Sequence, residues 1–185
     1  MFNKDLLLFD IEATGINVTK HEVIQLAAIL LDKKTLKEKK RFDMYIKPKR
    51  WTNREREAMA VNNITWDKLK DAKDAKTVLR MFVKTFGPDV IPATYGGNLD
   101  IIFFPAMFRD AGLKYPFDYH TYNFWPLAYT YMAKRKKLKN KKRFAGFTLE
   151  ELGKDLGVKE ADGRHSALVD CEYEANILRK LLTKF

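Results

Sequence analysis

Two acidic residues, Asp10 and Glu12, follow a continuous apolar run and lie two positions apart in the chain. The run at residues 6–9 predicts a strand that is buried on both faces. Side chains two apart on a strand point to the same side, so both carboxylates would project together from its end. Like charges this close are costly to bury, and hard cations such as Mg²⁺ and Mn²⁺ prefer carboxylate oxygen. The pair therefore predicts a cation site, with two ordinary surface acids as the alternative.

Two distant segments carry further residues of the same chemistry. Asp100 lies in the first turn of a helix predicted at residues 99–111, directly after a predicted strand at 90–95. The carboxyl ends of strands are where sites are usually built in open α/β sheets. Near the C-terminus, His165 and Asp170 stand five positions apart at the start of a helix predicted at residues 166–183. An unperturbed His titrates near neutral pH, which suits a general base.

These residues and their order resemble the DEDDh exonucleases, the family of the bacterial proofreading (epsilon) subunit, ribonuclease T and oligoribonuclease. The resemblance covers residues 6 to about 182, and three ordered motifs carry it. The family motifs are D-x-E-x-T-G, an Asp followed by x-x-F-[LF], and H-x-x-x-x-D. They match Asp10, Glu12, Thr14 and Gly15, then Asp100, Phe103 and Phe104, then His165 and Asp170. A sister subgroup carries Tyr in a Y-x-x-x-D spacing, so the His subgroup matches better.

The resemblance implies a metal-dependent 3′→5′ exonuclease that releases nucleoside monophosphates. Two divalent cations, Mg²⁺ or Mn²⁺, would be held by the four acids Asp10, Glu12, Asp100 and Asp170, with His165 as general base. Two such ions activate water and clamp the attacking and leaving oxygens of a phosphodiester. The implied fold is ribonuclease H-like.

The resemblance also implies contacts to the terminal nucleotide. Thr14 and Gly15 would meet it through backbone groups, and Ile16 is placed like the family's apolar wedge, with an ordinary core residue as the alternative. Asn62 stands where the family often has His, and is either a substrate contact or a turn residue. The chain departs from the family at Gly96, where an Asn is common, and the role of that Asn is not carried over to Asn98.

The order of predicted elements indicates an α/β protein with a mixed sheet of about five strands flanked by helices, in a single domain spanning residues 1–185. Strands are expected at residues 6–13, 21–31, 41–46, 90–95 and 117–122. Helices are expected at 52–60, from 66, at 75–86, 99–111, 125–134, from 148 with Thr148 as its cap, and at 166–183. The lone cysteine, Cys171, is expected to be a core residue.

Charge points to a polyanionic partner. The chain has 35 Lys and Arg against 24 Asp and Glu, a net charge of +11, and a basic surface favours nucleic acid. The densest run, residues 134–143, offers backbone contacts through Lys136, Lys137, Lys141 and Lys142, with a solvated loop as the alternative.

The leading interpretation is an exonuclease on single-stranded DNA or frayed 3′ ends, as in proofreading or DNA repair, with a polymerase as a possible partner. The first alternative is a 3′→5′ exoribonuclease, because sugar discrimination depends on contacts to the 2′-hydroxyl. A non-catalytic nucleic-acid-binding or polymerase-accessory module is the second, although such modules typically lack a metal ligand. No run reaches membrane-spanning length, and the expected location is the cytoplasm.

Overall fold

The computed structural model describes residues 2–96, 98–139, 145–159 and 166–185. Its strands are β1 (Leu6–Ala13), β2 (Val23–Leu31), β3 (Glu38–Tyr45), β4 (Ile91–Thr94) and β5 (Tyr122–Asn123). Its α-helices are α1 (Arg56–Asn62), α2 (Trp66–Leu69), α3 (Ala75–Phe86), α4 (Asn98–Asp110), α5 (Trp125–Lys134), α6 (Leu149–Leu156) and α7 (Ala167–Leu182). None of the helices in these ranges combines the length and apolar character needed to cross a membrane.

The described strands form one mixed sheet in the order β3-β2-β1-β4-β5. β1 pairs with β2, and β2 with β3, in antiparallel hairpin fashion, whereas β4 joins β1 in parallel and β5 joins β4 in parallel. β1 is therefore central, and its apolar run is covered on both faces. The predicted α/β architecture with about five strands is confirmed.

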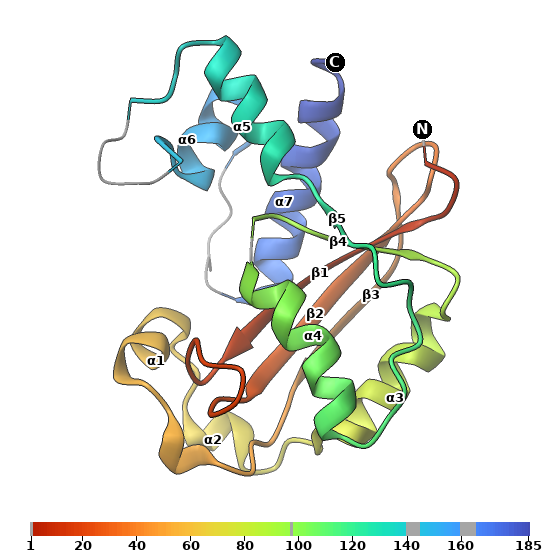
Figure 1. The fold of residues 1–185 in the computed structure, drawn as a ribbon, viewed down its shortest axis with the longest axis vertical. Helices are drawn as coiled ribbons and strands as arrows, with labels where there is room; N and C mark the ends of the chain where they lie inside the picture. The colour runs from red at the N-terminus through yellow and green to blue at the C-terminus, as the bar shows by residue number, and fades with distance from the viewer. Residues whose placement is uncertain (1, 97, 140–144, 160–165) are drawn as a thin grey trace.

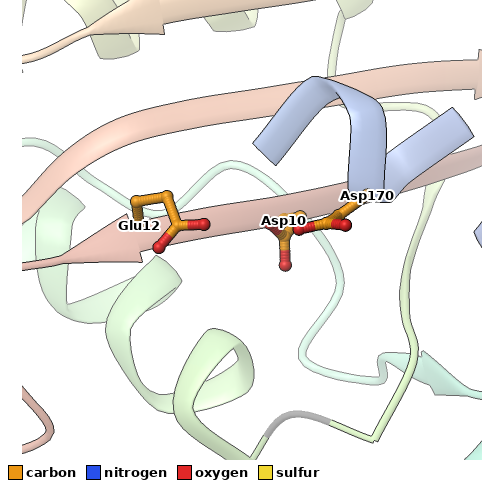
Figure 2. A group of neighbouring side chains, drawn as sticks. All are labelled: Asp10, Glu12 and Asp170. Carbon is orange, nitrogen blue, oxygen red and sulfur yellow. The ribbon is translucent and has the colours of Figure 1, made fainter. Parts of the chain in front are cut away.

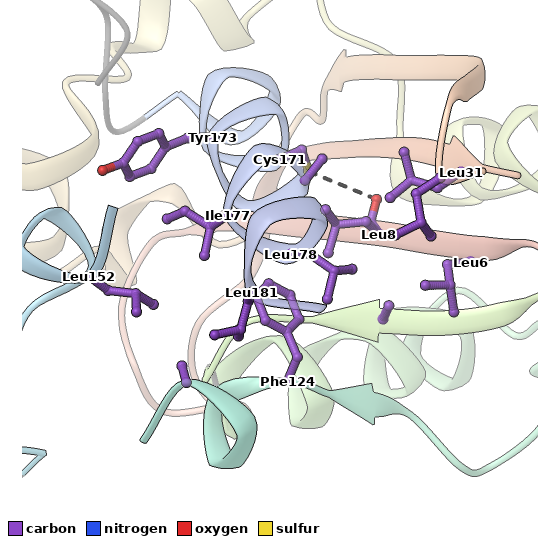
Figure 3. Packing of buried hydrophobic residues seen from close by; sticks show 14 of the residues in the cluster. Leu6, Leu8, Leu31, Phe124, Leu152, Cys171, Tyr173, Ile177, Leu178 and Leu181 are labelled. Atoms are coloured by element: carbon purple, nitrogen blue, oxygen red, sulfur yellow. Dashed lines mark hydrogen bonds between the residues drawn. The ribbon is translucent and has the colours of Figure 1, made fainter. Parts of the chain in front are cut away.

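Alternation along β1 divides the core into two layers. Leu6 and Leu8 face α7, α5 and α6, while Leu7, Phe9 and Ile11 face α3 and α4. Figure 1 shows α4 and α3 on one side of the sheet, with α7 on the other. Figure 3 shows the α7 layer, in which side chains of α7 pack onto β1 and β2. Asp10 and Glu12 continue the phase of Leu6 and Leu8, so they project toward α7.

Cys171 belongs to this layer and is fully buried. Its Sγ lies 3.9 Å from the Leu8 carbonyl oxygen (Figure 3) and 3.7 Å from that of Ala27. Burial raises the pKa of its thiol well above the usual value, with nearby carboxylates adding to the shift. The expectation of a core cysteine is confirmed.

Two local predictions were wrong and one was confirmed. The strand expected at 117–122 is reduced to Tyr122–Asn123, because Phe117 turns into the apolar cluster under α4 instead of pairing with β4. The helix expected at 52–60 is split into a 3₁₀ turn, Trp51–Asn53, and α1, whose N-cap is Glu55. Thr148 caps α6 as predicted, and together with Glu151 it forms a capping box.

Candidate active site

Asp10, Glu12 and Asp170 form a cluster where β1 meets the first turn of α7. Each offers a carboxylate oxygen, and these atoms lie within 4.8 Å of one another. Figure 2 shows the two β1 side chains and Asp170 of α7 converging from their separate elements. Asp10 and Glu12 are half-buried and Asp170 is buried. Two segments 160 residues apart thus bring three hard oxygen donors to one point, which suits a divalent cation.

Asp100 approaches the same point from the N-terminal end of α4. Its carboxylate accepts a hydrogen bond from Thr94 Oγ1 at 3.1 Å and one from the backbone N–H of Ile11. Thr94 ends β4, and Ile11 lies between the two β1 acids, so the two bonds fix Asp100 against β4 and β1. Its negative charge also raises the pKa of Asp10 and of Glu12. The structure therefore brings Asp10, Glu12 and Asp170 together and places Asp100 beside them.

The pKa values of Asp10, Glu12 and Asp100 are raised above those of free acids. Burial is the largest cause for Asp10, whose pKa is raised well above its usual value, and the charges of Asp100, Glu174, Glu12 and Asp170 add to it. Burial and the charges of Asp170 and Asp100 raise the pKa of Glu12 to about 8. Burial likewise raises the pKa of Asp100. A dication would remove the repulsion that causes part of these shifts, so the donor set fits divalent metal ions.

A fifth acid, Glu174, was not predicted. It lies one helical turn beyond Asp170 on α7, is 6% exposed, and its charge raises the pKa of Asp10. The i,i+4 spacing from Asp170 places both on one helix face, a signal that was present in the sequence.

The loop after β1 is held by the chain on both sides. Thr14 is buried; its N–H donates to the Glu22 carbonyl at 2.9 Å, and its Oγ1 accepts from the Glu22 N–H at 3.0 Å. Its own carbonyl accepts from the Glu55 N–H at 2.7 Å. This loop is the segment expected to meet a terminal nucleotide.

His21 and Glu55 contact the same loop after β1, and the sequence analysis identified neither residue. The Asn17 N–H donates to His21 Nδ1 at 2.9 Å, so that nitrogen must carry the lone pair and the ring proton lies on Nε2. Nε2 faces Glu55 Oε1 at 3.5 Å, and Glu55 Oε2 accepts from the Ile16 N–H at 3.3 Å. Because Glu55 comes from the cap of α1, no local pattern in the sequence connects it with His21.

Asn62 uses its amide within the protein. Nδ2 donates to the Ala13 carbonyl at 3.3 Å, Oδ1 accepts from the Ile64 N–H at 3.0 Å, and the amide also hydrogen-bonds Glu12. The residue is 6% exposed. Asn62 thus orients Glu12 and turns the chain after α1. Ile16, by contrast, is 66% exposed, which removes the core alternative and leaves its side chain available to a ligand.

Several predicted residues lie outside the described part of the chain. His165, Lys141 and Lys142 are among them, as is the side chain of Asn98. Lys136 and Lys137 are described, and they follow α5. Lys137 Nζ lies 3.2 Å from Asp155 Oδ1, so part of its charge is used within the protein, whereas Lys136 is exposed.

The mixed sheet flanked by helices is a ribonuclease H-like fold, and the acids converge at the end of its central strand. A family model named RNase_T and described as an exonuclease matches residues 7–178, and the chain belongs to this exonuclease family. Comparison with curated proteins finds no match.

Similar solved structures agree with the fold. Cell-death related nuclease 4 (CRN-4) superposes with a TM-score of 0.79 at 18% identity, over 98% of this chain and 64% of that one. The nuclease domain of 3′hExo, a DEDDh family member bound to rAMP, gives 0.72 at 23% identity over 98% and 92%. E. coli Exonuclease I in complex with a dA16 oligonucleotide gives 0.72 at 17% identity over 98% and 41%. The chain therefore spans less than two thirds of the length of CRN-4 and of Exonuclease I.

Proposed function

We propose that this protein is a metal-dependent 3′→5′ exonuclease that removes nucleoside monophosphates from single-stranded DNA or frayed 3′ ends. The convergence of Asp10, Glu12 and Asp170 within 4.8 Å carries the proposal, because it places three hard donors together in a protein of net charge +11. Such an arrangement has little use in a binding module, since the acids alone would repel phosphate.

In this proposal the residues of the site divide into metal ligands, a general base, positioning residues and a substrate-binding loop. Asp10, Glu12, Asp100 and Asp170 hold two divalent cations, Mg²⁺ or Mn²⁺. When bound, such ions lower the pKa of a water and neutralise charge on the scissile phosphate. His165 accepts the proton of the attacking water. Thr94 and Asn62 keep Asp100 and Glu12 in place, and the loop of Thr14, Gly15 and Ile16 receives the terminal nucleotide.

Similar solved structures include one RNA complex and one DNA complex, so they do not distinguish between the two sugars. One is a 3′-exonuclease in 3′-end-specific recognition of a histone mRNA stem-loop, and another is Exonuclease I with a DNA oligonucleotide. RNA is therefore the second candidate substrate for this chain. A polymerase partner, a role in proofreading or repair, and a cytoplasmic location are parts of the proposal that rest on the family resemblance.

The test uses 5′-labelled DNA and RNA oligonucleotides of one sequence, each with Mg²⁺, Mn²⁺ or EDTA. We expect a ladder that shortens from the 3′ end in the presence of metal on one of the two substrates. Asp10→Asn should abolish it, while the matched control Asp71→Asn, an exposed acid between α2 and α3, should not. Full activity in EDTA or in Asp10→Asn would contradict the proposed chemistry.

A further inference from the structure

A large hollow lies on the α4 side of the sheet, away from the carboxylates. Its volume is about 910 Å³, and it is bounded by the loop after β1, the segment after β3, the start of α3 and the C-terminal half of α4. In Figure 1 these elements meet below the label of α4. All of its lining residues belong to the described ranges, and the family motifs account for none of its charges.

The floor of the hollow is apolar and its rim is cationic. Val23, Ile46, Phe103 and Met107 line it from below, while Lys47, Lys49 and Lys76 lie at its edge and are exposed. An apolar bed beside cations matches a nucleotide, whose base is apolar on its faces and whose phosphate is anionic.

The acids of the hollow are already engaged within the protein. Glu22 Oε2 accepts from the Arg50 N–H at 2.6 Å, Asp110 Oδ1 lies 2.8 Å from Arg109 Nε, and Asp74 caps α3 through Thr77. Among the described residues, by contrast, no acid lies within ion-pair distance of Lys47, Lys49 or Lys76. The rim therefore carries positive charge that the described part of the chain does not neutralise.

Two elements connect the hollow with the candidate active site. Val18, Thr19 and His21 line it, and they belong to the loop that begins at Thr14 and Gly15. Phe103 and Met107 line it from α4, the helix whose first turn carries Asp100. With a rise of 1.5 Å per residue, Met107 lies roughly 10 Å along the helix from Asp100.

We propose that this hollow, bounded by Lys47, Lys49 and Lys76, binds the single strand upstream of the nucleotide being removed. The lysines contact its phosphates and the apolar floor carries its bases. The inference rests on the proposed function, since it assumes that the 3′ end lies at the Thr14–Gly15 loop. It differs from the expectation for residues 134–143, whose described part, at the end of α5, lies on the opposite side of the sheet.

The test is a triple variant, Lys47→Ser/Lys49→Ser/Lys76→Ser, compared with Lys34→Ser/Lys37→Ser/Lys184→Ser. The control removes three positive charges from exposed lysines. Lys34 and Lys37 lie in the β2–β3 turn, at the end of these two strands that is farther from the hollow. Binding of a fluorescent 12-nucleotide single strand is measured by anisotropy in Ca²⁺ at several salt concentrations. Hydrolysis of a dinucleotide in Mg²⁺ is measured separately.

We expect the first variant to bind the 12-mer about tenfold more weakly and the control to bind within about twofold of wild type. The negative slope of log binding constant against log salt concentration should become shallower by about 2, because each phosphate that a lysine no longer neutralises removes about 0.7. Dinucleotide turnover should be unchanged in both. Equal weakening in both variants, or wild-type binding in the first, would overturn the inference. Absence of hydrolysis by the wild type would instead contradict the proposed function and leave the binding comparison intact.

Discussion

His21 and Glu55 close on Gly15 from two sides, with His21 Nε2 3.5 Å from Glu55 Oε1. A Cβ built on Gly15 would overlap the imidazole of His21 and would lie 2.7 Å from Glu55 Cδ. The glycine of the first motif is therefore required by a close approach of side chains and not by an unusual backbone angle.

Gly15→Ala should lower the unfolding free energy by about 1–3 kcal/mol, the usual cost of overpacking, and should displace the loop. His21→Ala introduced together with it should restore part of the loss, because it removes the nearest atoms. Thermal unfolding of the two single variants and the double variant gives the coupling. If the stability changes of the two single variants simply add in the double variant, contact with His21 is not what excludes a side chain at Gly15.

Glu55→Ala should raise KM for a dinucleotide several-fold, because the Ile16 N–H loses its acceptor and the loop that receives the 3′ end loosens. Glu55→Gln should restore most of the KM, since an amide oxygen can accept the same hydrogen bond. Mn²⁺ affinity, measured by calorimetry, should be unaffected in both because the carboxylate cluster is untouched. If Glu55→Gln is as impaired as Glu55→Ala, the negative charge matters and not the hydrogen bond.

The metal-free protein should become less stable as pH rises from about 4.5 to about 8. In this window folded Glu12 retains a proton that the unfolded chain has lost, because its pKa is raised to about 8. The folded state thus binds more protons than the unfolded state, and the unfolding free energy falls with increasing pH. Melting temperatures in EDTA at pH 5 and pH 8 measure this, and Glu12→Gln should flatten the dependence.

Divalent cations should reverse the effect, with a larger stabilisation by Mn²⁺ at pH 8 than at pH 5. A melting temperature in EDTA that rises toward pH 8, with the same slope in Glu12→Gln, would contradict the shift at Glu12.

Asp100→Asn should abolish hydrolysis and stabilise the metal-free protein by about 1–3 kcal/mol, because it removes one charge from a buried group of like charges. The amide can still accept from Thr94 Oγ1, so the local hydrogen bond survives. Denaturant unfolding in EDTA and a 3′-end assay in Mg²⁺ measure the two effects. Activity near that of wild type would exclude Asp100 as a metal ligand.

His165→Ala should lower kcat by roughly 10²–10⁴, the usual range for loss of a general base. Mn²⁺ binding should remain, because the four carboxylates are intact. His165→Gln serves as the control for side-chain size, and it should be equally slow. A normal rate in either variant would place the base elsewhere.

The grouping of the predicted carboxylates follows from the spacing of the motifs, which maps directly onto local geometry. Asp10 and Glu12 share a face through strand alternation, and Asp100 and Asp170 both lie in the first turn of a helix. Sequence patterns could not reveal Glu55, since its approach to His21 depends on how α1 folds back over the loop. The bond of Asn62 to the Ile64 N–H agrees with the turn-residue alternative, but its contact with Glu12 was missed for the same reason, because the two residues meet only after the chain has turned.

α7 is secured differently at its two ends. Leu178 and Leu181 fix its later turns through apolar contacts with the sheet, and this attachment does not depend on dissolved ions. Its first turn is also packed, since Ala167 and Cys171 are buried, but it carries Asp170 into a group of mutually repelling acids. One helix thus combines apolar packing along its later turns with a carboxylate of the candidate metal site in its first turn. Loss of bound cations would therefore be expected to loosen the first turn of α7 before its later turns.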